Sequence, residues 1–334
     1  MSDRRRILLT GSSGFIGTNL MAHLQATGAE VLNVDPSPPL DHDHRRSWVA
    51  LSVLDRDHLT KVISGFRPSD VVHLAAETST TGRRSLSDYR VNTEGTANVL
   101  AAVAATPSAR RIIITSTQFV CRPGYVPKDD LDVDPHTVYG ESKVLVENIT
   151  RAQGAGEAAW TIVRPTTIWG PWDIAYRRSF YRLLRRGLYV HPAVPPCTRS
   201  YGYVGNLAWQ LERILTLPVD IVAGRVLYVG DRMIDLRTYV DEFVAQCTGK
   251  ATRTVPLGVA RSLARIGDAA SALGIPSAPL TSGRLDSMTT DYPVPIESTF
   301  ELLGEPPFPL DAGVTATLGW LRASVWDGGR RALV

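Results

Sequence analysis

The chain has 334 residues, 44% of them hydrophobic and 21% charged, which is an ordinary globular composition with enough apolar surface for a sizeable core. Its 36 basic and 33 acidic residues leave a net charge of +3, which argues against nucleic acid as a main partner. The three cysteines form no CxxC pair, and the apolar run at 7–9 is too short for a signal peptide or a membrane span. We therefore expect a cytoplasmic protein with no disulfide framework and no membrane partner.

Strand-like and helix-like segments alternate through the first half of the chain. Apolar, often β-branched runs predict strands at 7–10, 30–34, 70–74, 111–115 and 160–164. Helical spacing of apolar residues predicts helices at 18–27, 92–105 and 139–153. Strands that are apolar on both faces and alternate with helices indicate an α/β fold, a Rossmann doubly wound parallel sheet that binds ligands at the carboxyl ends of its strands.

The character of the sequence changes after Arg164, where proline and glycine become frequent. We expect a dinucleotide-binding domain at 1–172 with a return segment at about 201–231. A smaller C-terminal α/β substrate-binding region is expected at 173–200 and 232–326. The end of the chain at 327–334 is expected to be a flexible tail.

Glycines stand at 11, 14 and 17, directly after the first predicted strand and at the start of the first helix. Gly11 would permit a tight turn, Gly14 a close approach of the backbone to a pyrophosphate, and Gly17 close packing of helix and strand. The helix N-terminus would then face the phosphates with its N–H groups. A plain glycine-rich turn is the alternative, but the strand before, the helix after and an acidic residue on the next strand favour a dinucleotide site.

That acidic residue is Asp35, at the end of the second predicted strand. Its carboxylate can accept hydrogen bonds from both hydroxyls of an adenosine ribose and would repel a 2′-phosphate. The residues at 36–38 include no arginine that could bind such a phosphate. The pattern therefore favours NAD over NADP, the alternative being that Asp35 merely caps a turn before Pro36.

Tyr139 and Lys143 are four residues apart, so they lie on one face of the predicted helix. A phenol with a pKa of about 10 is a poor base at neutral pH, and a neighbouring ammonium group favours its ionised form. The Thr117 hydroxyl, just beyond the strand at 111–115, could hydrogen-bond the substrate oxygen that Tyr139 protonates or deprotonates. The YxxxK spacing also occurs by chance on exposed helices, and it gains weight here from the glycine loop upstream.

The loop TGSSGFIG at 10–17 resembles the TGxxGFIG loop of the extended short-chain dehydrogenases, the family of sugar-nucleotide epimerases and dehydratases. Further segments resemble that family's motifs in order, namely HLAA at 73–76, NTEGTAN at 92–98, ST at 116–117, YGESK at 139–143, RPTTIWGP at 164–171 and RSYGYVGNLA at 199–208. The resemblance covers about residues 5–210 and is vaguer to about 322. It implies an NAD-dependent epimerase or oxidoreductase.

The resemblance also implies a homodimer that pairs through the two helices carrying the Asn92 and Tyr139 motifs. Apolar side chains on those helices that could serve such a contact are Val99, Leu100, Val103, Val146 and Ile149.

The resemblance assigns roles to individual residues. Catalysis is expected from Tyr139, supported by Lys143, Thr117 and Asn92. Contacts with NAD are expected from the glycine loop, the strand ends and the catalytic helix, namely Gly11, Ser13, Gly14, Phe15, Ile16, Gly17, Asp35, Leu54, Leu74, Ala75, Ala76, Thr115, Tyr139, Lys143, Pro165 and Ile168. Contacts with substrate are expected from Thr78, Thr117, Gln118, Phe119, Thr167, Arg177, Arg199 and Arg284.

Arg199 stands at the position of a family arginine that binds substrate phosphate. Arg177 belongs to a run of arginines at 177–186 whose alternative role is a basic solvent-exposed face.

Departures from the family pattern bear on the substrate. Gln118 and Phe119 stand where dehydratases of the family carry an acid pair, and neither side chain can exchange protons as a carboxylate does. This argues against dehydration. Thr167 replaces an asparagine that contacts the sugar nucleotide, and the segment before Arg199 lacks the family's GDG. These changes leave the cofactor chemistry as expected and weaken the case for any particular sugar.

Two further features are expected to have structural roles. The Asp-His-Asp-His run at 41–44 has the composition of a metal cluster, but it lies in a loop beside two arginines and is expected to be solvated. No metal is therefore expected. Cys121 has no base paired to it in the sequence and is expected to line the pocket.

The leading hypothesis is NAD-dependent modification of a nucleotide-linked sugar, by epimerisation through a transient keto intermediate. The first alternative is an NAD(P)-dependent dehydrogenase or ketoreductase of a keto-sugar or a sterol-like alcohol, which the changes at 167 and before Arg199 favour somewhat. The second alternative is a non-catalytic NAD-binding sensor, which would not need Thr117, Tyr139 and Lys143 together.

Overall fold

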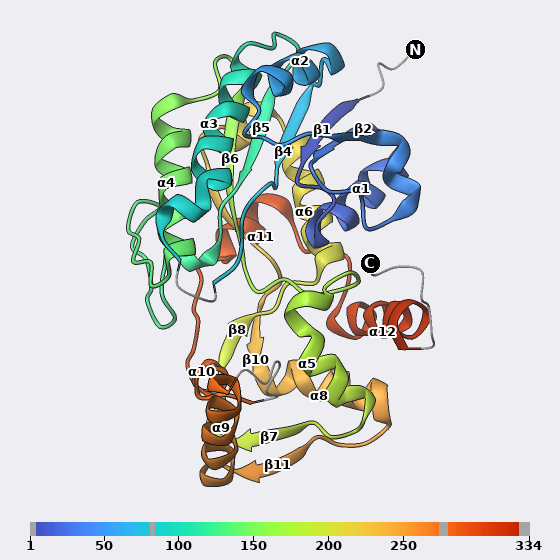
Figure 1. The fold of residues 1–334 in the computed structure, drawn as a ribbon, viewed down its shortest axis with the longest axis vertical. Coiled ribbons are helices and arrows are strands. Elements are labelled where there is room, and N and C mark those ends of the chain that lie inside the picture. The colour runs from blue at the N-terminus through green and yellow to red at the C-terminus, as the bar shows by residue number, and fades with distance from the viewer. Residues whose placement is uncertain (1–4, 81–83, 274–279, 327–334) are drawn as a thin grey trace.

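The computed structural model describes residues 5–80, 84–273 and 280–326, and it describes no side chains for 174–179. The tail expected at 327–334 and the side chain of Arg177 therefore lie outside the described residues. Figure 1 shows two parts, a sheet flanked by helices and, below it, a smaller part built from short strands and helices.

Seven parallel strands form the main sheet in the order β3-β2-β1-β4-β5-β6-β9. They are β1 (Arg6–Thr10), β2 (Glu30–Asp35), β3 (Trp48–Ala50), β4 (Asp70–His73), β5 (Arg111–Thr115), β6 (Ala159–Pro165) and β9 (Val226–Val229). The strand order reverses between β1 and β4, which is where doubly wound sheets bind ligands. The expected fold class is confirmed.

Apolar side chains alternate between the two faces of the sheet and fill a core on each side. Ile7 and Leu9 of β1 point to one face, which α1 (Phe15–Ala26), α6 (Val204–Thr216) and α11 (Glu297–Leu303) cover. Leu8 points to the other face, which α2 (Arg56–Phe66), α3 (Arg90–Ala104) and α4 (Val138–Gln153) cover. Burial on both faces explains the continuous apolar runs in the sequence.

The structure adds elements that the sequence did not predict. β3 pairs with β2 over three residues and is partly exposed, so its pattern is too short to recognise. α2 buries Leu59 and Ile63, and the Asp55 side chain caps it by accepting a hydrogen bond from the His58 N–H. Shorter turns are the 3-10 helices His42–Ser47, Leu86–Tyr89 and Gln118–Val120, the helix α7 (Val219–Val222) and the π-helical turn Arg322–Trp326.

The smaller part contains two two-stranded sheets. In one, β7 (Val190–Ala193) runs parallel to β11 (Arg253–Pro256), and in the other β8 (Thr198–Ser200) runs antiparallel to β10 (Met233–Asp235). Its helices are α5 (Ile174–Arg185), α8 (Leu236–Thr248), α9 (Leu257–Ala272), α10 (Ser282–Ser287) and α12 (Leu310–Leu321). Aromatic rings around Trp169, Tyr239 and Phe243 form its core.

The chain passes between the two parts more than once. After the crossing near Trp169 it returns to the main sheet as α6 and β9, within the expected return segment, and later as α11. α11 lies in the range expected for the substrate-binding region, yet its Leu303 packs in the core of the main sheet. Among the described residues, no helix is both long and apolar enough to cross a bilayer.

Candidate active site

Two glycines shape the loop between β1 and α1. Gly11 has a φ of 73°, and a Cβ there would lie 2.4 Å from the backbone nitrogen of Ala75. A Cβ on Gly17 would lie 2.2 Å from the Cα of Ser12, so the first turn of α1 packs directly on the loop backbone. Gly14 is the N-cap of α1 and supplies no side-chain cap, which suits this helix N-terminus to an anion.

Asp35 ends β2 beside this loop. Its carboxylate accepts hydrogen bonds from the backbone N–H groups of Ser37 at 2.9 Å and Ser13 at 3.2 Å. Burial raises the pKa of Asp35, and these two backbone donors partly oppose that effect. Two donors use only part of the acceptor capacity of a carboxylate, so the side chain can also bind ribose hydroxyls.

The residues present fit a dinucleotide cofactor. A glycine turn, a helix N-terminus without a side-chain cap and a carboxylate on the next strand are the parts that a Rossmann fold uses for pyrophosphate and ribose. The other expected NAD contacts lie in the same turn, at the start of α1, or at and beyond the carboxyl ends of β3 to β6, namely Ser13, Phe15, Ile16, Leu54, Leu74, Ala75, Ala76, Thr115, Pro165 and Ile168.

His73 joins three elements beneath the glycine loop. Its Nδ1 lies 2.7 Å from Thr10 Oγ1 in β1, and its Nε2 lies 3.0 Å from Thr96 Oγ1 in α3. Burial, with a smaller contribution from the charge of Lys143, lowers the pKa of His73 to about 3. The imidazole is therefore neutral at physiological pH and holds β1, β4 and α3 together.

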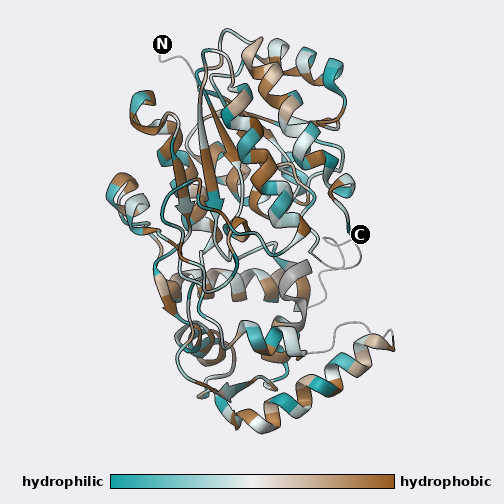
Figure 2. Ribbon diagram, turned by 90° about the vertical axis from the view of Figure 1, so that its left-hand side faces the viewer, coloured by the Kyte–Doolittle hydropathy of each residue, from teal (hydrophilic) through white to brown (hydrophobic). Residues whose placement is uncertain are grey.

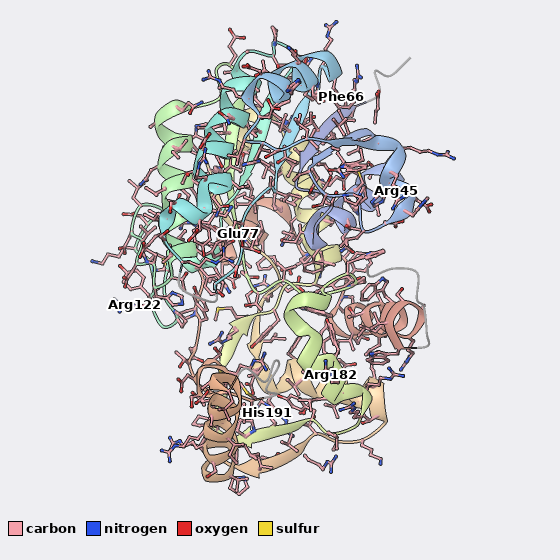
Figure 3. The ribbon with its side chains drawn as sticks, viewed as in Figure 1. Arg45, Phe66, Glu77, Arg122, Arg182 and His191 are labelled. Atoms are coloured by element: carbon pink, nitrogen blue, oxygen red, sulfur yellow. The ribbon has the colours of Figure 1, made fainter. Side chains whose placement is uncertain are left out.

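Asn92 is fully buried and links the loop after β4 to the catalytic helix. Its Nδ2 donates to the Glu77 carbonyl at 3.0 Å and to Ser142 Oγ at 2.9 Å, while its Oδ1 accepts from the Glu77 N–H at 2.8 Å. Figure 3 labels Glu77 at the lower end of the main sheet, and the exposed Thr78 follows it. The bonding pattern makes Asn92 a positioning residue for this loop.

Thr117 and Tyr139 meet beyond the carboxyl end of β5. Thr117 lies two residues after that strand, Tyr139 lies in the first turn of α4, and the Thr117 hydroxyl is near enough to the phenol to influence its pKa. Both are buried, with 6% and 8% of their surface exposed. Burial raises the pKa of Tyr139 to about 12, against a smaller opposing effect of the Thr117 hydroxyl. The phenol therefore holds its proton at neutral pH.

Lys143 differs from the expectation that it lowers the pKa of Tyr139. Its Nζ donates to the backbone carbonyl of Thr115 at 2.8 Å, which directs the ammonium group to the end of β5. Burial lowers the pKa of Lys143 to about 8, and the charge of Glu147 opposes this shift. In this geometry, ionisation of Tyr139 requires positive charge in addition to that of Lys143.

A buried ion-pair network that the sequence analysis missed lies behind these residues. Glu147, one turn after Lys143, accepts two hydrogen bonds from Arg164 at 2.8 Å each and one from the Ser116 hydroxyl at 2.7 Å. Arg164 is 0% exposed and also donates to the backbone carbonyl of Asp130. The sequence contains one sign of this network, because an acidic residue stands four positions after Lys143 on the same helix and an arginine stands in the following strand.

The residues that replace the dehydratase acid pair lie beside Tyr139. Gln118 Nε2 donates to Thr167 Oγ1 at 3.0 Å. The Phe119 ring centroid lies 6.2 Å from the ring centroids of both Tyr139 and Tyr292. The Tyr292 hydroxyl donates to the Gln118 carbonyl at 2.9 Å. Tyr292 comes from the C-terminal part of the chain, where no local motif marked it in the sequence.

The structure does not bring the expected substrate arginines together. Arg199, in β8, donates two hydrogen bonds to the Thr290 carbonyl and lies 5.7 Å from the centroid of the Tyr292 ring. Arg284 is exposed on α10, which Figure 1 places in the smaller part, away from the main sheet. The side chain of Arg177 lies outside the described residues. Of these three expected arginines, Arg199 is the one whose described side chain lies over the Tyr292 ring.

A doubly wound sheet with a glycine loop, an acid at the end of β2 and a threonine–tyrosine–lysine set beyond β5 defines a dinucleotide-dependent enzyme of the short-chain dehydrogenase/reductase type. Residues 7–230 match the NAD dependent epimerase/dehydratase family. The chain belongs to this family, which confirms the family and the cofactor, NAD, that were expected from the sequence.

Relatives of this chain include epimerases and dehydrogenases. It is 30% identical, over 75% of its own length and 73% of the other, to an Escherichia coli O157:H7 protein named N-acetyl-alpha-D-glucosaminyl-diphospho-ditrans,octacis-undecaprenol 4-epimerase. It is 27% identical, over 69% of its length and 66% of the other, to a 3-beta-hydroxysteroid dehydrogenase of Mycolicibacterium neoaurum. A solved UDP-glucose 4-epimerase from Thermotoga maritima shares the fold with a TM-score of 0.70 at 20% identity, over 96% of this chain and 99% of that one.

Proposed function

We propose that the protein is an NAD-dependent epimerase of a sugar carried on a diphosphate, which includes the nucleotide-linked sugars expected from the sequence and polyprenol-linked sugars. The observation that carries this proposal is the buried Thr117–Tyr139 pair beyond β5, in a chain whose family includes epimerases and whose relatives include a diphospho-undecaprenol sugar epimerase. One sugar hydroxyl becomes a ketone and is restored with the opposite configuration.

Tyr139 exchanges the proton of the reacting hydroxyl, and Thr117 orients the same oxygen. The glycine loop and Asp35 would hold NAD, which would supply a hydride acceptor and a positive charge at the site. Because burial raises the pKa of Tyr139 to about 12, the phenol is a stable proton donor and becomes a base when positive charge is added beside it. Lys143 holds the end of β5, and Asn92 holds the loop after β4.

Gln118, Phe119 and Thr167 form the substrate side of the site. Phe119 gives an aromatic wall beside Tyr139, against which the apolar face of a sugar ring can lie. Gln118 is engaged with Thr167 and carries no titratable group, so the site lacks the acid pair that elimination of water would need.

Replacing Tyr139 with Phe is expected to lower kcat by at least about a hundredfold with little change in NAD affinity, because it removes the proton donor and keeps the ring. The measurement is interconversion of UDP-glucose and UDP-galactose, and of the two 4-epimers of a polyprenyl-diphosphate N-acetylhexosamine, followed by mass spectrometry and NMR. Tyr125→Phe makes the same chemical change at a half-buried tyrosine whose hydroxyl bonds Asp132 in the loop at 122–134, outside the proposed catalytic set, and it serves as the control. Full activity of the Tyr139 variant on a substrate that the wild type converts would exclude this mechanism.

The nucleotide released when the purified protein is denatured tests the redox-neutral part of the proposal. Near-stoichiometric NAD supports an epimerase that never releases its cofactor. An empty site that binds NAD weakly supports a dehydrogenase that exchanges cofactor in each turnover. Release of NADP would contradict the role given to Asp35.

A second candidate is a dehydrogenase of a sterol-like alcohol. Relatives named 3-beta-hydroxysteroid dehydrogenases match at 27% identity. Arg199, which was expected to bind a substrate phosphate, instead donates to the Thr290 carbonyl and lies over the Tyr292 ring. The aromatic pair of Phe119 and Tyr292 also suits an apolar substrate. Formation of NADH from NAD and a 3β-hydroxysteroid, measured by absorbance, would favour this candidate, whereas its absence alongside sugar epimerisation excludes it.

We further propose a homodimer that pairs through α3 and α4, located in the cytoplasm. Of the apolar side chains named for that contact, Val99, Leu100, Val103 and Val146 are buried in the core of the chain itself and cannot serve it. Leu145, 38% exposed on α4, remains available. Light scattering of the wild type and of Leu145→Arg tests this dimer, and an unchanged mass would count against pairing at α4.

A further inference from the structure

A row of exposed apolar side chains runs along α9 and its C-cap. Val259, Leu263, Ile266 and Leu273 are 48%, 44%, 66% and 80% exposed. They stand at positions i, i+4, i+7 and i+14, which share one face of a helix. The described residues include twelve exposed large hydrophobic side chains, so a third of them lie on this single helix face. The row is therefore a patch and not a scatter of single exposed residues.

The other faces of α9 have a different chemistry. Ala260, Ala264 and Gly267 are buried where the helix packs against α10, β7 and β11. Asp268 accepts hydrogen bonds from the backbone and hydroxyl groups of Ser282 at 3.0 and 2.5 Å, so its charge is directed to α10. Arg261 and Arg265 are exposed on the polar side, and both line the groove between α9 and α10.

The position of α9 leaves this row accessible. Figure 2 shows α9 as the lowest helix of the molecule, projecting beyond the rest of the smaller part with hydrophobic and hydrophilic residues on its surface. Exposure is greatest at Ile266 and Leu273, in the second half of the helix and at its C-cap. The apolar row therefore lies at an extremity of the molecule, where a flat surface can reach it.

We propose that α9 is an interfacial helix that docks the protein on the surface of a bilayer containing anionic phospholipid. The row of Val259, Leu263, Ile266 and Leu273 enters the boundary between headgroups and acyl chains, and Arg261 and Arg265 attract the anionic headgroups. An apolar stripe opposite a cationic polar face is the pattern of helices that lie in this interface. The inference deepens the proposed function and rests on it in one respect, because a sugar on a polyprenyl diphosphate is presented at such a surface.

A second copy of the chain fits this row less well than a bilayer does. α9 has 16 residues and is roughly 24 Å long, and its row consists of four side chains that are already partly covered. Stable protein–protein interfaces bury about 800 Å² on each partner, which is more than such a row can supply. A bilayer accepts a narrow row, because lipids rearrange around each inserted side chain.

Sedimentation with vesicles tests the proposal without substrate or NAD. The full chain is mixed with vesicles of phosphatidylcholine alone and of phosphatidylcholine with phosphatidylglycerol, and the bound fraction is measured at low and high salt. Binding is expected on the anionic vesicles and is expected to weaken with salt, because headgroup attraction by the arginines is screened.

Variants locate the contact. The double variant Leu263→Gln/Ile266→Gln is expected to weaken vesicle binding by at least about tenfold, since it removes two inserted apolar side chains. The matched control Val126→Gln/Leu131→Gln changes side chains that are 63% and 69% exposed in a loop of the other part, and it should bind as the wild type does. In Ile266→Trp, tryptophan emission should shift to shorter wavelength on addition of anionic vesicles, which gives a readout independent of the double variant.

Three outcomes would overturn the inference. In the first, the wild type binds neither kind of vesicle. In the second, the wild type and the Leu263/Ile266 variant bind vesicles equally. In the third, the wild type forms a dimer that the variant loses, and neither protein binds vesicles. The third outcome would assign the row to a second copy. Because none of these measurements uses catalysis, loss of epimerase activity and loss of membrane binding are distinguished directly.

Discussion

Gly11 and Gly28 share a left-handed backbone, with φ angles of 73° and 84°, but differ in their surroundings. A Cβ on Gly11 would lie 2.4 Å from the Ala75 nitrogen, whereas one on Gly28 would meet nothing within 4 Å. Comparing alanine substitutions at the two positions separates the destabilisation caused by the positive φ angle from that caused by a steric clash of the added Cβ. Gly11 is required both by its positive φ angle and by the close approach of the Ala75 backbone. At Gly28 only the positive φ angle favours glycine.

Gly11→Ala is therefore expected to abolish NAD binding and to lower the melting temperature more than Gly28→Ala does. The Gly28 variant should lose about 1 kcal/mol of stability and retain NAD affinity, because only the unfavourable positive φ angle destabilises it. Thermal unfolding and NAD titration of both variants test this. Equal effects of the two substitutions on NAD binding would show that the clash with Ala75 does not matter.

His73 predicts a pH dependence of stability. Burial lowers its folded-state pKa to about 3, whereas in the unfolded chain it protonates near its usual value of about 6.5. The unfolded chain thus binds more protons between these values, and stability falls as pH decreases from about 6.5 towards 3. Between pH 7 and 5 this residue accounts for about 2 kcal/mol. His73→Gln should show a smaller loss in urea unfolding over that interval, and an unchanged pH slope would contradict this origin.

At the scale of the element, α4 carries three side chains of the proposed site and its ion-pair network at intervals of four residues. Tyr139, Lys143 and Glu147 follow one face of the helix, so a single element sets the phenol, the ammonium group and its buried counter-charge. The helix is anchored by the Thr137 hydroxyl, which accepts a hydrogen bond from the Gly140 N–H, and by Arg164 in β6. This spacing is readable in the sequence, whereas the pairing with β6 is not.

Glu147→Gln is expected to lower the free energy of unfolding by about 3–5 kcal/mol, because it leaves the guanidinium of Arg164 buried without its partner charge. It should also lower the pKa of Lys143 further below about 8, since the Glu147 charge raises that pKa. Glu141→Gln makes the same change at an exposed position of the same helix and should be nearly neutral. Similar stabilities of the two variants in urea would contradict the role of the network.

At the scale of the whole molecule, Tyr292 joins the C-terminal part of the chain to the active-site turn. Its hydroxyl lies within hydrogen-bond distance of the backbone carbonyls of Gln118 and Cys121, more than 170 residues earlier in the chain, and its single proton is shared between them. Its ring contacts Phe119 and lies under Arg199. The turn at 118–121, which carries proposed substrate contacts, is therefore held by a residue from the C-terminal part of the chain.

Tyr292→Phe is expected to raise KM for the sugar substrate by about tenfold, because it leaves two buried carbonyls without this donor and loosens the turn at 118–121. NAD affinity should remain unchanged, because Tyr292 bonds the turn at 118–121, whereas Asp35 bonds Ser13 and Ser37. Steady-state kinetics and NAD titration separate the two effects. A loss of NAD affinity equal to the change in KM would indicate general unfolding instead.

The local features of this protein could be read from the sequence. The glycine loop, the strand before it, Asp35 and the Tyr139–Lys143 spacing each occupy a short stretch whose geometry follows from backbone sterics and helical periodicity. The strand at 111–115 and the helix at 139–153 were accordingly predicted to within a residue. β3 was not predicted, because three partly exposed residues give little periodic signal. α2 was also missed, although Leu59, Val62, Ile63 and Phe66 recur at helical spacing after the capping residue Asp55.

By itself, the sequence determined the class of fold and the dinucleotide loop, and it supplied the Tyr139–Lys143 spacing on which the proposed proton exchange rests, since these patterns involve neighbours a few positions apart. Tertiary structure alone decided that Lys143 points to Thr115, that Arg199 bonds Thr290 and that Tyr292 closes the site. Packing also raises the pKa of Tyr139 through burial, whereas the sequence had led us to expect that the ammonium group of Lys143 lowers it. The physical reason is that partner choice and desolvation depend on segments far apart in the chain, which only the packing of the folded molecule brings together.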